Sequence, residues 1–578
     1  MKYNGVVEDA TFFTRPKLEW QRRYEALRAS LVDRQPDKVV AGRFGYAPGY
    51  VRLLRFKFRH GQLDFSEPVP EGKASRRRVT AETRGKICDW RKRRLSAGEI
   101  TELLSEDGIE ISVRTVERVL VEEGFPKLPR RTRLKVGRTV KGTEVPQRTE
   151  RVTLRALRGQ AFDSPGAGVF LFAPFLAQLE IGKVLRSARL PSTKAIPARN
   201  YLLSFLALKL LGTERYAHAG DHGFDPGLGV FAGLNVLPKS TAMSTYAYSL
   251  NEQQVQRLQH AFVRQVNELS LYDGGVVNLD FHTTPHYGEK SQLDKHWAGA
   301  RGKKMKGALT LFAQDVETKL LLYSAADILR DETNDQILSF LSFWRRVRRG
   351  VKPTFVFDSR LTTYSRLDEL NARDVKFITL RRRGSGMIAA LKKVKEWKRI
   401  HIPHGKRKFP NPQVYESMVN LRDYDGHVRQ IVVRGHGREK PAFLITNDLE
   451  KPAELVVGDY SRRWRIENGI AEAVKFFSLN ALSSPILVKV HFDVAMTLVA
   501  DTLYSMLAQK LRGFEQCNAP KLFRHFVRGK GRVAIEGSTV TVTYPKRAHN
   551  PVLRAVPWKR LPTSLPGLRG GELALRFK

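Results

Sequence analysis

The first part of the chain carries apolar residues at helical spacing, interrupted by glycine and proline. The spacing predicts two short helices around a break at Gly45–Pro48, with inward residues Val40, Phe44, Val51, Leu54 and Phe58. A sharp turn followed by a basic helix is typical of a helix-turn-helix, so residues 1–65 are predicted to be a first such domain. Its second helix would present Arg52, Arg55 and Lys57 to DNA. The alternative is a plain helical hairpin with a basic, solvated face.

A second unit of the same plan, residues 80–128, is predicted to follow a polar linker at residues 66–79. Ser96 and Glu99 have the spacing of a capping box, which predicts the start of one helix. Gly108 predicts the turn to a second helix. The apolar residues that this second helix would turn inward are Val113, Val116, Val119 and Leu120. The residues that it would turn outward, as a recognition helix needs, are Arg114, Thr115 and Arg118.

Beyond these units the chain is predicted to be helical first and then to alternate between strands and helices. Residues 129–160 are predicted to be a basic connector suited to following a phosphate backbone, and residues 161–271 a helical domain. Next come three strands, a helix, and a strand–helix–strand unit, which is an α/β pattern with a mixed sheet. The predicted strands are Val276–His282, Ala308–Asp315, Thr318–Ala325, Pro353–Asp358 and Val375–Leu380, and the helices are Asp335–Arg348 and Tyr364–Ala372.

The remaining pattern predicts a β-rich stretch followed by helices. Residues 415–437 are predicted to form a hairpin about Asp425–Gly426, and Ala442–Thr446 another strand. Residues 459–477 have the spacing of one continuous helix. The last predicted elements are core helices within Ile486–Leu511 and a hairpin within Arg532–Tyr544.

Composition adds a polyanionic partner to this picture. The 578 residues include 100 Lys+Arg and 58 Asp+Glu, a net charge of +42, although the hydrophobic fraction of 42% is that of a folded protein. The basic excess is spread along the chain, since residues 1–150 hold 33 basic and 21 acidic residues and residues 301–410 hold 26 and 11. Nucleic acid is the first candidate partner. A basic ribosomal or membrane-surface protein is the alternative on charge alone.

The sequence also argues against several classes of protein. The two cysteines, Cys88 and Cys517, are too few and too far apart for a disulfide framework or a cysteine zinc site. The first residues lack the apolar core of a signal peptide, and no charge-free apolar run reaches the ~20 residues of a membrane span. We therefore expect a soluble, cytosolic protein with no membrane partner.

Three acids stand at positions that suggest chemistry. Asp280 lies inside the first strand of the α/β region, and Asp358 ends another strand at a carboxyl edge, where open α/β sheets bind ligands. A salt bridge is the alternative for each, and a helix cap is a further one for Asp358. Glu467 shares one face of a predicted helix with Tyr460 and Arg463, at spacings of three and four.

Convergent carboxylates behind DNA-binding units predict two-metal phosphoryl-transfer chemistry. Two Mg²⁺ ions, ~4 Å apart and held by Asp280, Asp358 and Glu467, would activate a water or a 3′-hydroxyl and stabilise the leaving oxygen. Mn²⁺ could substitute for Mg²⁺. Arg463 would bind a non-bridging phosphate oxygen, and Tyr460 would position a neighbouring phosphate.

The run YSRRWRIE, residues 460–467, resembles the signature of a known family. In the DDE transposases of bacterial insertion sequences of the Tyr-Arg-Glu-Lys type, these four residues follow one another with intervals of two, three and six residues. Tyr460, Arg463 and Glu467 match that spacing, whereas Val474 occupies the lysine position and Lys475 follows it. The resemblance implies phosphate-binding roles for Tyr460, Arg463 and Lys475.

The resemblance also implies a fold class: a multidomain α/β protein with an RNase H-like catalytic core, a β-rich insertion and preceding all-α helix-turn-helix domains. Asp280 would lie on the first strand of the core and Asp358 at the end of the fourth. The implied domains are residues 272–380 for the first part of the core, 381–454 for the insertion, 455–512 for the glutamate helix with its packing helices, and 513–578 for a C-terminal hairpin and tail.

The implied insertion begins with a strongly basic segment. Residues 381–409 hold eleven Lys and Arg against one acid, Glu396, which favours contact with DNA over a merely solvated face. The residues predicted to make that contact are Arg381, Arg382, Lys392 and Lys393. In related enzymes a tryptophan of the insertion stacks on a flipped base, and Trp397 is the candidate here.

We therefore predict a cut-and-paste DNA transposase that binds the terminal inverted repeats of its element. Its partner would be double-stranded DNA, bound by a homodimer in a synaptic complex, and its place the bacterial cytoplasm in association with the nucleoid. One alternative is a non-catalytic, sequence-specific DNA-binding protein, such as a regulator or an inactive domesticated relative. Another is a structural or repair nuclease that cuts without requiring specific repeats.

Overall fold

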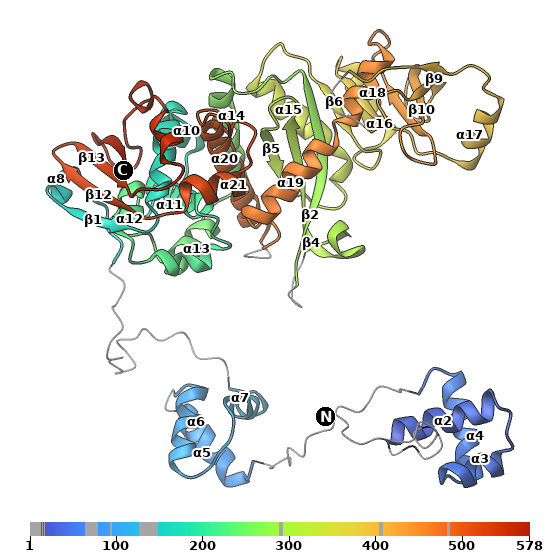
Figure 1. Cartoon of the computed structure of the whole chain (residues 1–578). Helices are drawn as coiled ribbons and strands as arrows, with labels where there is room; N and C mark the ends of the chain where they lie inside the picture. The colour runs from blue at the N-terminus through green and yellow to red at the C-terminus, as the bar shows by residue number, and fades with distance from the viewer. Residues whose placement is uncertain are drawn as a thin grey trace. The chain divides into compact units, whose positions relative to one another are not determined.

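The structure is a computed structural model of the whole chain, in which the chain divides into two units, residues 1–143 and 144–578 (Figure 1). It describes residues 13, 16, 18–63, 79–92, 95–125, 148–287, 293–326, 328–403, 408–481 and 486–578. The predicted linker at 66–79 therefore lies outside the described residues except for its last residue. The predicted basic connector is described only from residue 148 onward.

The first unit contains two small helical groups with separate cores. The first group consists of α2 (Glu19–Leu31), α3 (Asp37–Phe44) and α4 (Pro48–Arg59). The predicted turn between the last two helices is confirmed, since Gly45 ends α3 with a φ of +70° that glycine adopts readily. The prediction that Phe58 points inward is wrong: its side chain is 47% exposed, because the buried face of α4 ends one turn earlier, at Leu54.

The second group consists of α5 (Ala81–Lys92), α6 (Ala97–Glu106) and α7 (Val113–Glu122). The capping box is confirmed, because Ser96 accepts a hydrogen bond from the Glu99 backbone and the Glu99 side chain accepts one from Ser96. Val113 was expected to point inward and is instead 43% exposed, since the buried stripe of α7 starts at Val116. The core of this group is Ile87, Ile100, Leu104, Val116, Val119 and Leu120.

The second unit is built on a long mixed sheet, as the α/β pattern predicts. Its strands are β2 (Val276–Pro285), β3 (Lys295–Ala298), β4 (Lys303–Asp315), β5 (Leu321–Ala325), β6 (Thr354–Phe357), β7 (Lys376–Leu380), β8 (Lys398–Arg399), β9 (Gln413–Asn420), β10 (His427–Arg434) and β11 (Ala442–Thr446). They follow the order β3-β4-β2-β6-β7-β11-β10-β9-β8, and β5 pairs with β4. The pairs β2–β6 and β6–β7 are parallel, and the other pairs are antiparallel.

The strands of the predicted β-rich insertion extend the central sheet. The hairpin about Asp425–Gly426 is confirmed as β9 and β10. β11 pairs with β7 through Leu444 and Leu380, so the backbone groups at the edge of β7 find partners within the same sheet. The segment 381–454 therefore continues the sheet that carries Asp280 and Asp358, and does not form a separate sheet.

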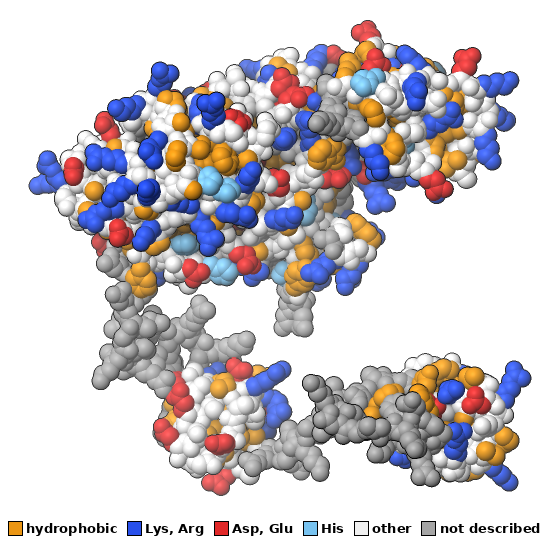
Figure 2. Space-filling view, in the orientation of Figure 1, with side chains coloured by type: hydrophobic (Ala, Val, Ile, Leu, Met, Phe, Trp, Pro, Cys, Tyr) orange, Lys and Arg blue, Asp and Glu red, His pale blue; other side chains and the backbone are white. Residues whose placement is uncertain are grey.

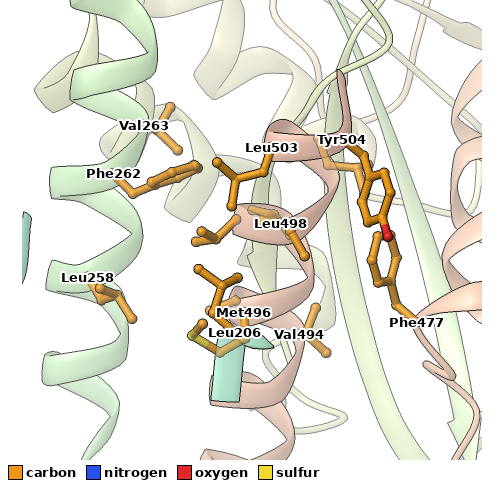
Figure 3. Close-up of a cluster of buried hydrophobic side chains, with 14 of the residues drawn as sticks. Leu206, Leu258, Phe262, Val263, Phe477, Val494, Met496, Leu498, Leu503 and Tyr504 are labelled. Atoms are coloured by element: carbon orange, nitrogen blue, oxygen red, sulfur yellow. The ribbon is translucent and has the colours of Figure 1, made fainter. Parts of the chain in front are cut away.

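Helices cover this sheet and form a large core beside it. They include α14 (Glu252–Glu268), α15 (Gln336–Val347), α16 (Tyr364–Ala372), α18 (Ala453–Ser461), α19 (Trp464–Phe476) and α20 (Leu487–Ala508). Figure 3 shows Leu258 and Phe262 of α14 facing Leu498 and Leu503 of α20 across this core. The core helices predicted within Ile486–Leu511 are one long buried helix, α20.

The predicted helical domain is confirmed as mainly helical. Its helices before α14 are η2 (Ala167–Phe172), α9 (Ala173–Gln178), α10 (Ile181–Ala188), α11 (Ala198–Leu210), η3 (Tyr216–His222), α12 (Pro226–Ala232) and α13 (Ser240–Tyr248). Within the described ranges, no single helix is long and apolar enough to cross a membrane; Ala167–Gln178 and Ile181–Ala188 meet that test only as a pair bent by 71°.

A second sheet joins the two ends of the second unit. It has the order β1 (Ala161–Ser164), β12 (Gly531–Glu536), β13 (Thr539–Tyr544) and β14 (Glu572–Phe577). The C-terminal hairpin is confirmed by β12 and β13, but the last residues are not a separate tail, because β14 runs parallel to β13. Figure 2 shows blue Lys and Arg side chains gathered over this end of the unit, with few red Asp and Glu side chains between them.

Candidate active site

The central sheet places Asp280 and Asp358 side by side. β2 and β6 run parallel, with Leu279 opposite Phe357 as the last pair of their register. Asp280 and Asp358 are the residues that follow this pair, and neighbouring strands lie about 4.8 Å apart. Beyond this point β6 has ended while β2 continues against β4. The two carboxylates therefore meet at the carboxyl end of β6, which is the sheet edge expected for a ligand site.

Glu467 reaches this edge from α19, which lies against β2 and β4 (Figure 1). A single guanidinium links it to the sheet: Nη2 of Arg463 is 2.6 Å from Oε1 of Glu467, and Nη1 is 3.6 Å from Oδ2 of Asp280. The Arg463 side chain is only 17% exposed, whereas Glu467 is 50% exposed. The geometry thus brings the three predicted acids and Arg463 into one cluster, with Glu467 open to solvent.

The helix predicted over residues 459–477 is broken in two. α18 ends at Ser461 and α19 starts at Trp464, because the hydrogen bonds tighten to an interval of three residues across the break. The Arg462 amide donates to the carbonyl of Asp459, and the Arg463 amide donates to the carbonyl of Tyr460, both at 3.0 Å. The prediction of a continuous helix is therefore wrong, and the break directs Arg463 toward Asp280.

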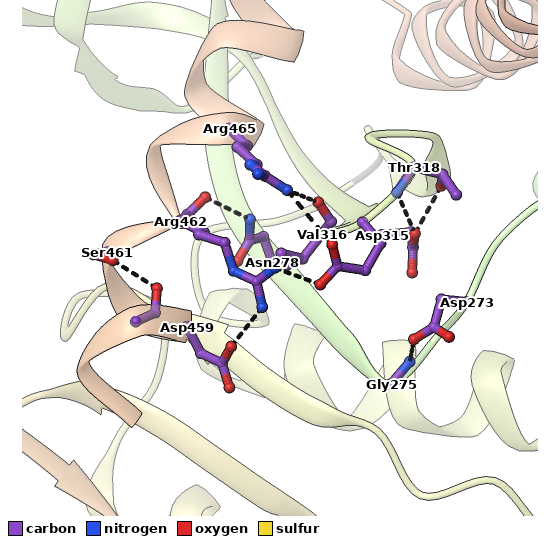
Figure 4. A network of polar contacts seen from close by, with 12 residues as sticks. Asp273, Gly275, Asn278, Asp315, Val316, Thr318, Asp459, Ser461, Arg462 and Arg465 are labelled. Carbon is purple, nitrogen blue, oxygen red and sulfur yellow. Dashed lines mark hydrogen bonds and ion pairs between the residues drawn. The ribbon is translucent and has the colours of Figure 1, made fainter. Parts of the chain in front are cut away.

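Buried polar contacts hold this break in place (Figure 4). Arg462 is almost fully buried, lies 2.6 Å from Asp459 and pairs with Glu317 in the turn between β4 and β5. Its carbonyl accepts a hydrogen bond of 3.2 Å from Nδ2 of Asn278. Since Asn278 and Asp280 lie on the same strand two residues apart, the break is fastened to the strand that carries the first acid.

Arg462, Asp459 and Asn278 are site residues that sequence reasoning missed. The signal that pointed to them was weak. Asn278 is a polar residue in the apolar run VVNLDF, and Arg462 stands beside Arg463 on a stretch with the spacing of one helix. A buried polar group needs a partner, but the sequence does not say which distant element supplies it.

Burial and like charge both act on the carboxylates. The pKa of Asp280 is raised to about 6, first by burial and then by the negative charges of Glu467 and Asp358, while Arg463 and the Phe281 amide lower it. Burial also raises the pKa of Tyr460 to about 12, although Arg463 opposes that shift. The Arg463 guanidinium lies 5.9 Å from the centre of the Tyr460 ring, so the phenol belongs to the same cluster.

These observations bear on whether the cluster suits a divalent cation. Three carboxylates are the hard oxygen donors that Mg²⁺ and Mn²⁺ prefer. The raised pKa of Asp280 means that negative charge is unfavourable at this edge, and a cation would relieve that cost. Within the described ranges no three His, Cys, Asp or Glu side chains are arranged to enclose an ion. The donor chemistry therefore fits, while Glu467 is turned toward Arg463.

The position where the Tyr-Arg-Glu-Lys signature has lysine is occupied by Val474. Val474 is half-buried and packs against the main hydrophobic core. Lys475 is exposed in the last turn of α19, and one residue turns a helix by about 100°. Val474, two turns after Glu467, points in nearly the same direction as Glu467. Lys475 therefore lies on a different side of α19.

The basic residues predicted to bind DNA are placed on several elements. Arg382, Lys392 and Lys393 are exposed around α17 (Ser385–Ala390), whereas Arg381 donates a hydrogen bond of 2.8 Å to Gln430. Trp397 is half-buried, with the Arg434 guanidinium 3.9 Å from its ring centre. One face of Trp397 is therefore already covered by a cation.

In the first unit, the predicted recognition residues differ in how free they are. Lys57 is exposed on α4, and so is Arg52, whose Nε lies 3.8 Å from Asp37. Arg55 is half-buried and pairs with the same Asp37 at 2.8 Å. On α7, Arg114 is exposed, Thr115 is half-buried, and Arg118 lies 3.8 Å from Glu122.

Comparison with known proteins bears on the same part of the chain. Residues 279–502 match the sequence model of a family described as the transposase DDE domain. No curated protein matches the chain. Among solved structures, the chain is similar to a chain in the cryo-EM structure of the piggyBac transposase synaptic complex with hairpin DNA. That similarity covers 66% of this chain and 82% of the other, at 10% sequence identity and with a TM-score of 0.34. The segment that brings Asp280, Asp358 and Glu467 together is thus similar to a transposase DDE domain.

Proposed function

We propose that the protein is a DNA transposase that cuts the ends of its element and joins them to new DNA. The observation that carries this proposal is the meeting of Asp280, Asp358 and Glu467 at one edge of the central sheet, inside the segment that matches the transposase DDE domain. The order β5-β4-β2-β6-β7 has three antiparallel strands followed by two parallel ones, which supports the assignment of an RNase H-like core.

In this proposal the three acids would hold two Mg²⁺ ions, for which Mn²⁺ could substitute. The bound ions would supply Lewis acidity to the attacking water or 3′-hydroxyl and to the leaving oxygen. Arg463 orients Glu467 and would donate to a non-bridging phosphate oxygen once DNA is bound. Tyr460 would place its hydroxyl against a neighbouring phosphate, and Lys475 would contact the backbone farther along α19.

The two helical groups of the first unit would recognise the terminal inverted repeats as helix-turn-helix domains. The supporting observations are the tight turn at Gly45, the capped start of α6 and the exposed basic residues of α4 and α7. We further propose that the protein acts as a homodimer in a synaptic complex, in the bacterial cytoplasm near the nucleoid. The net charge of +42 supports DNA, a polyanion, as the binding partner.

The test is cleavage of DNA that carries the sequences flanking the gene, with and without Mg²⁺ or Mn²⁺. Strand cleavage by the full chain and its loss in Asp280→Asn, Asp358→Asn and Glu467→Gln are expected. The matched control is Glu472→Gln, which removes an acid of the same helix whose carboxylate instead accepts a hydrogen bond from Asn518. All variants should bind the DNA. Binding without any cleavage would identify a regulator, and cleavage that ignores the flanking repeats would identify a nuclease.

A further inference from the structure

Four arginines from three parts of the sequence meet in the second unit, away from the acidic cluster. Arg186 belongs to the last turn of α10 and Arg199 to the first turn of α11. A Cβ placed on Gly182 would lie 3.6 Å from Nη2 of Arg199 and 3.7 Å from Nη1 of Arg186. Both guanidinium groups therefore lie over the same glycine.

Backbone contacts bring Arg151 and Arg569 to the start of α11. Arg151 forms a bridge with Leu234, and the side chain of Asn200, which follows Arg199, donates to the carbonyls of Ala232 and Gly233 at 2.7 and 3.1 Å. A Cβ on Gly233 would overlap with the carbonyl of Gly567, two residues before Arg569. The segments around residues 151, 199, 233 and 567 are thus held together by their own packing.

The charge of these arginines has no counterpart in the described part of the chain. No ion pair joins any of the four to a carboxylate there, whereas the neighbouring Glu180 is 3.2 Å from Lys183. The pKa of Arg199 is lowered, by burial first and then by the positive charges of Arg151, Arg186 and Arg569. Three of the four side chains are exposed and Arg199 is half-buried. Such an arrangement repels itself unless an anion is present.

We propose that Arg151, Arg186, Arg199 and Arg569 form a binding site for the phosphate backbone of duplex DNA, separate from the acidic cluster. Guanidinium groups suit phosphate because they donate two parallel hydrogen bonds and keep their charge. Arg151 also lies within the basic connector predicted over residues 129–160, close to residue 144, where the second unit begins. The choice of DNA rests on the proposed function, and this site would be a second place, besides the acidic cluster, where the protein binds its DNA substrate.

The test compares two full-length variants that each lose four positive charges. The first is Arg151→Gln/Arg186→Gln/Arg199→Gln/Arg569→Gln. The matched control changes four cations that already have acidic partners, Arg215, Lys352, Arg373 and Arg422, to Gln. Binding to a duplex of fixed, arbitrary sequence is measured over a series of salt concentrations with EDTA present, so that no cleavage can occur.

The cluster variant is expected to bind about tenfold more weakly or worse, with a salt dependence less steep by about 0.9 for each phosphate that the protein no longer neutralises. The affinity of the control variant for the duplex, and its salt dependence, should stay close to those of the natural protein. Without DNA, the thermal midpoint of the cluster variant should be unchanged or higher, because repulsion has been removed. Arg151→Gln/Arg569→Gln, which leaves the half-buried Arg199 intact, should give about half the change in slope if the four arginines contribute equally.

Equal reductions in affinity for the cluster variant and the control would overturn the site, because they would reflect net charge alone. Natural affinity in the cluster variant would overturn it as well, as would weaker binding of an RNA duplex but not of DNA. The natural protein could fail to cut DNA while the cluster variant binds DNA more weakly than it does. That pair of results would contradict the proposed function and support this site. If the natural protein cuts DNA and the cluster variant binds DNA as tightly as the natural protein, the proposed function is supported and this site is contradicted.

Discussion

Nη2 of Arg463 lies 2.6 Å from Oε1 of Glu467, and this contact decides where the third acid of the cluster points. The same guanidinium lies 3.6 Å from Asp280, so one buried cation balances two of the three carboxylates. Without it, the negative charges would face one another at an edge where burial already raises the pKa of Asp280 to about 6. Arg463 is therefore a positioning residue before DNA binds.

We expect Arg463→Gln to lower the rate of strand cleavage by about 100-fold, because the variant has no charged donor aimed at the reacting phosphate and at Glu467. Arg463→Lys keeps the charge but cannot donate two parallel hydrogen bonds, so it should recover only part of the rate. Single-turnover cleavage at saturating Mg²⁺ measures the effect. Full activity in Arg463→Gln would remove Arg463 from the site.

The buried hydrogen bond between Asn278 and the Arg462 carbonyl leads to a second prediction. Asn278→Ala should lower the free energy of unfolding by about 2 kcal/mol, since the variant lacks a fully buried side chain and its 3.2 Å hydrogen bond. Cleavage should fall as well, because the break that aims Arg463 would no longer be tied to β2. Urea unfolding and the cleavage assay measure the two effects.

Gln256→Ala is the matched control for this prediction. Gln256 donates a 2.6 Å hydrogen bond to Glu252 of α14, but at the exposed surface. A surface change of this kind should alter stability by less than about 0.5 kcal/mol and leave cleavage unchanged. If both variants behaved alike, the tie to β2 would have no special role.

The elements around the three acids could be predicted because their signals are local. Short β-rich apolar runs located β2, β6 and β7, and the helix Tyr364–Ala372 has the same bounds in the sequence prediction as in the structure. Parallel strands bring their carboxyl ends to one edge, so the position of Asp358 at the end of an apolar run was informative. The pairing of Asp280 with Asp358 follows from the same rule.

Other features depend on contacts between distant residues and left no local trace. Residues 459–477 have unbroken helical spacing, yet the helix breaks, because Arg462 finds Glu317 and Asn278 more than a hundred residues away. The pairing of β1 with β12 joins residues 161–164 to 531–534 and could not be predicted from either strand alone. The arginine cluster was missed for the same reason.

A third prediction concerns the close approach of η2 to the segment Phe523–Val527. A Cβ on Gly168 would overlap with the backbone carbonyl of Val527, so no side chain fits without moving that backbone. Gly168→Ala should therefore destabilise the second unit by about 3 kcal/mol. The control is Gly386→Ala in α17, where a Cβ would meet nothing within 4 Å and a gain of up to about 1 kcal/mol is expected. Thermal unfolding compares the two.

The last prediction concerns a buried histidine and the stability of the protein toward acid. His491 lies in the core on α20, where Nε2 is 2.8 Å from Nε2 of Gln259 and 3.1 Å from the carbonyl of Ser324. Burial lowers its pKa to about 4. Because the unfolded chain takes up this proton near pH 6.5 and the folded chain does not, stability is complete above about pH 6.5 and falls as the pH drops toward 4. The decrease should reach about 3 kcal/mol at pH 4. Unfolding of the natural protein and of His491→Gln, followed from pH 8 to pH 4, measures it: the variant should lack this part of the pH dependence, and an unchanged slope would assign the acid sensitivity to other groups.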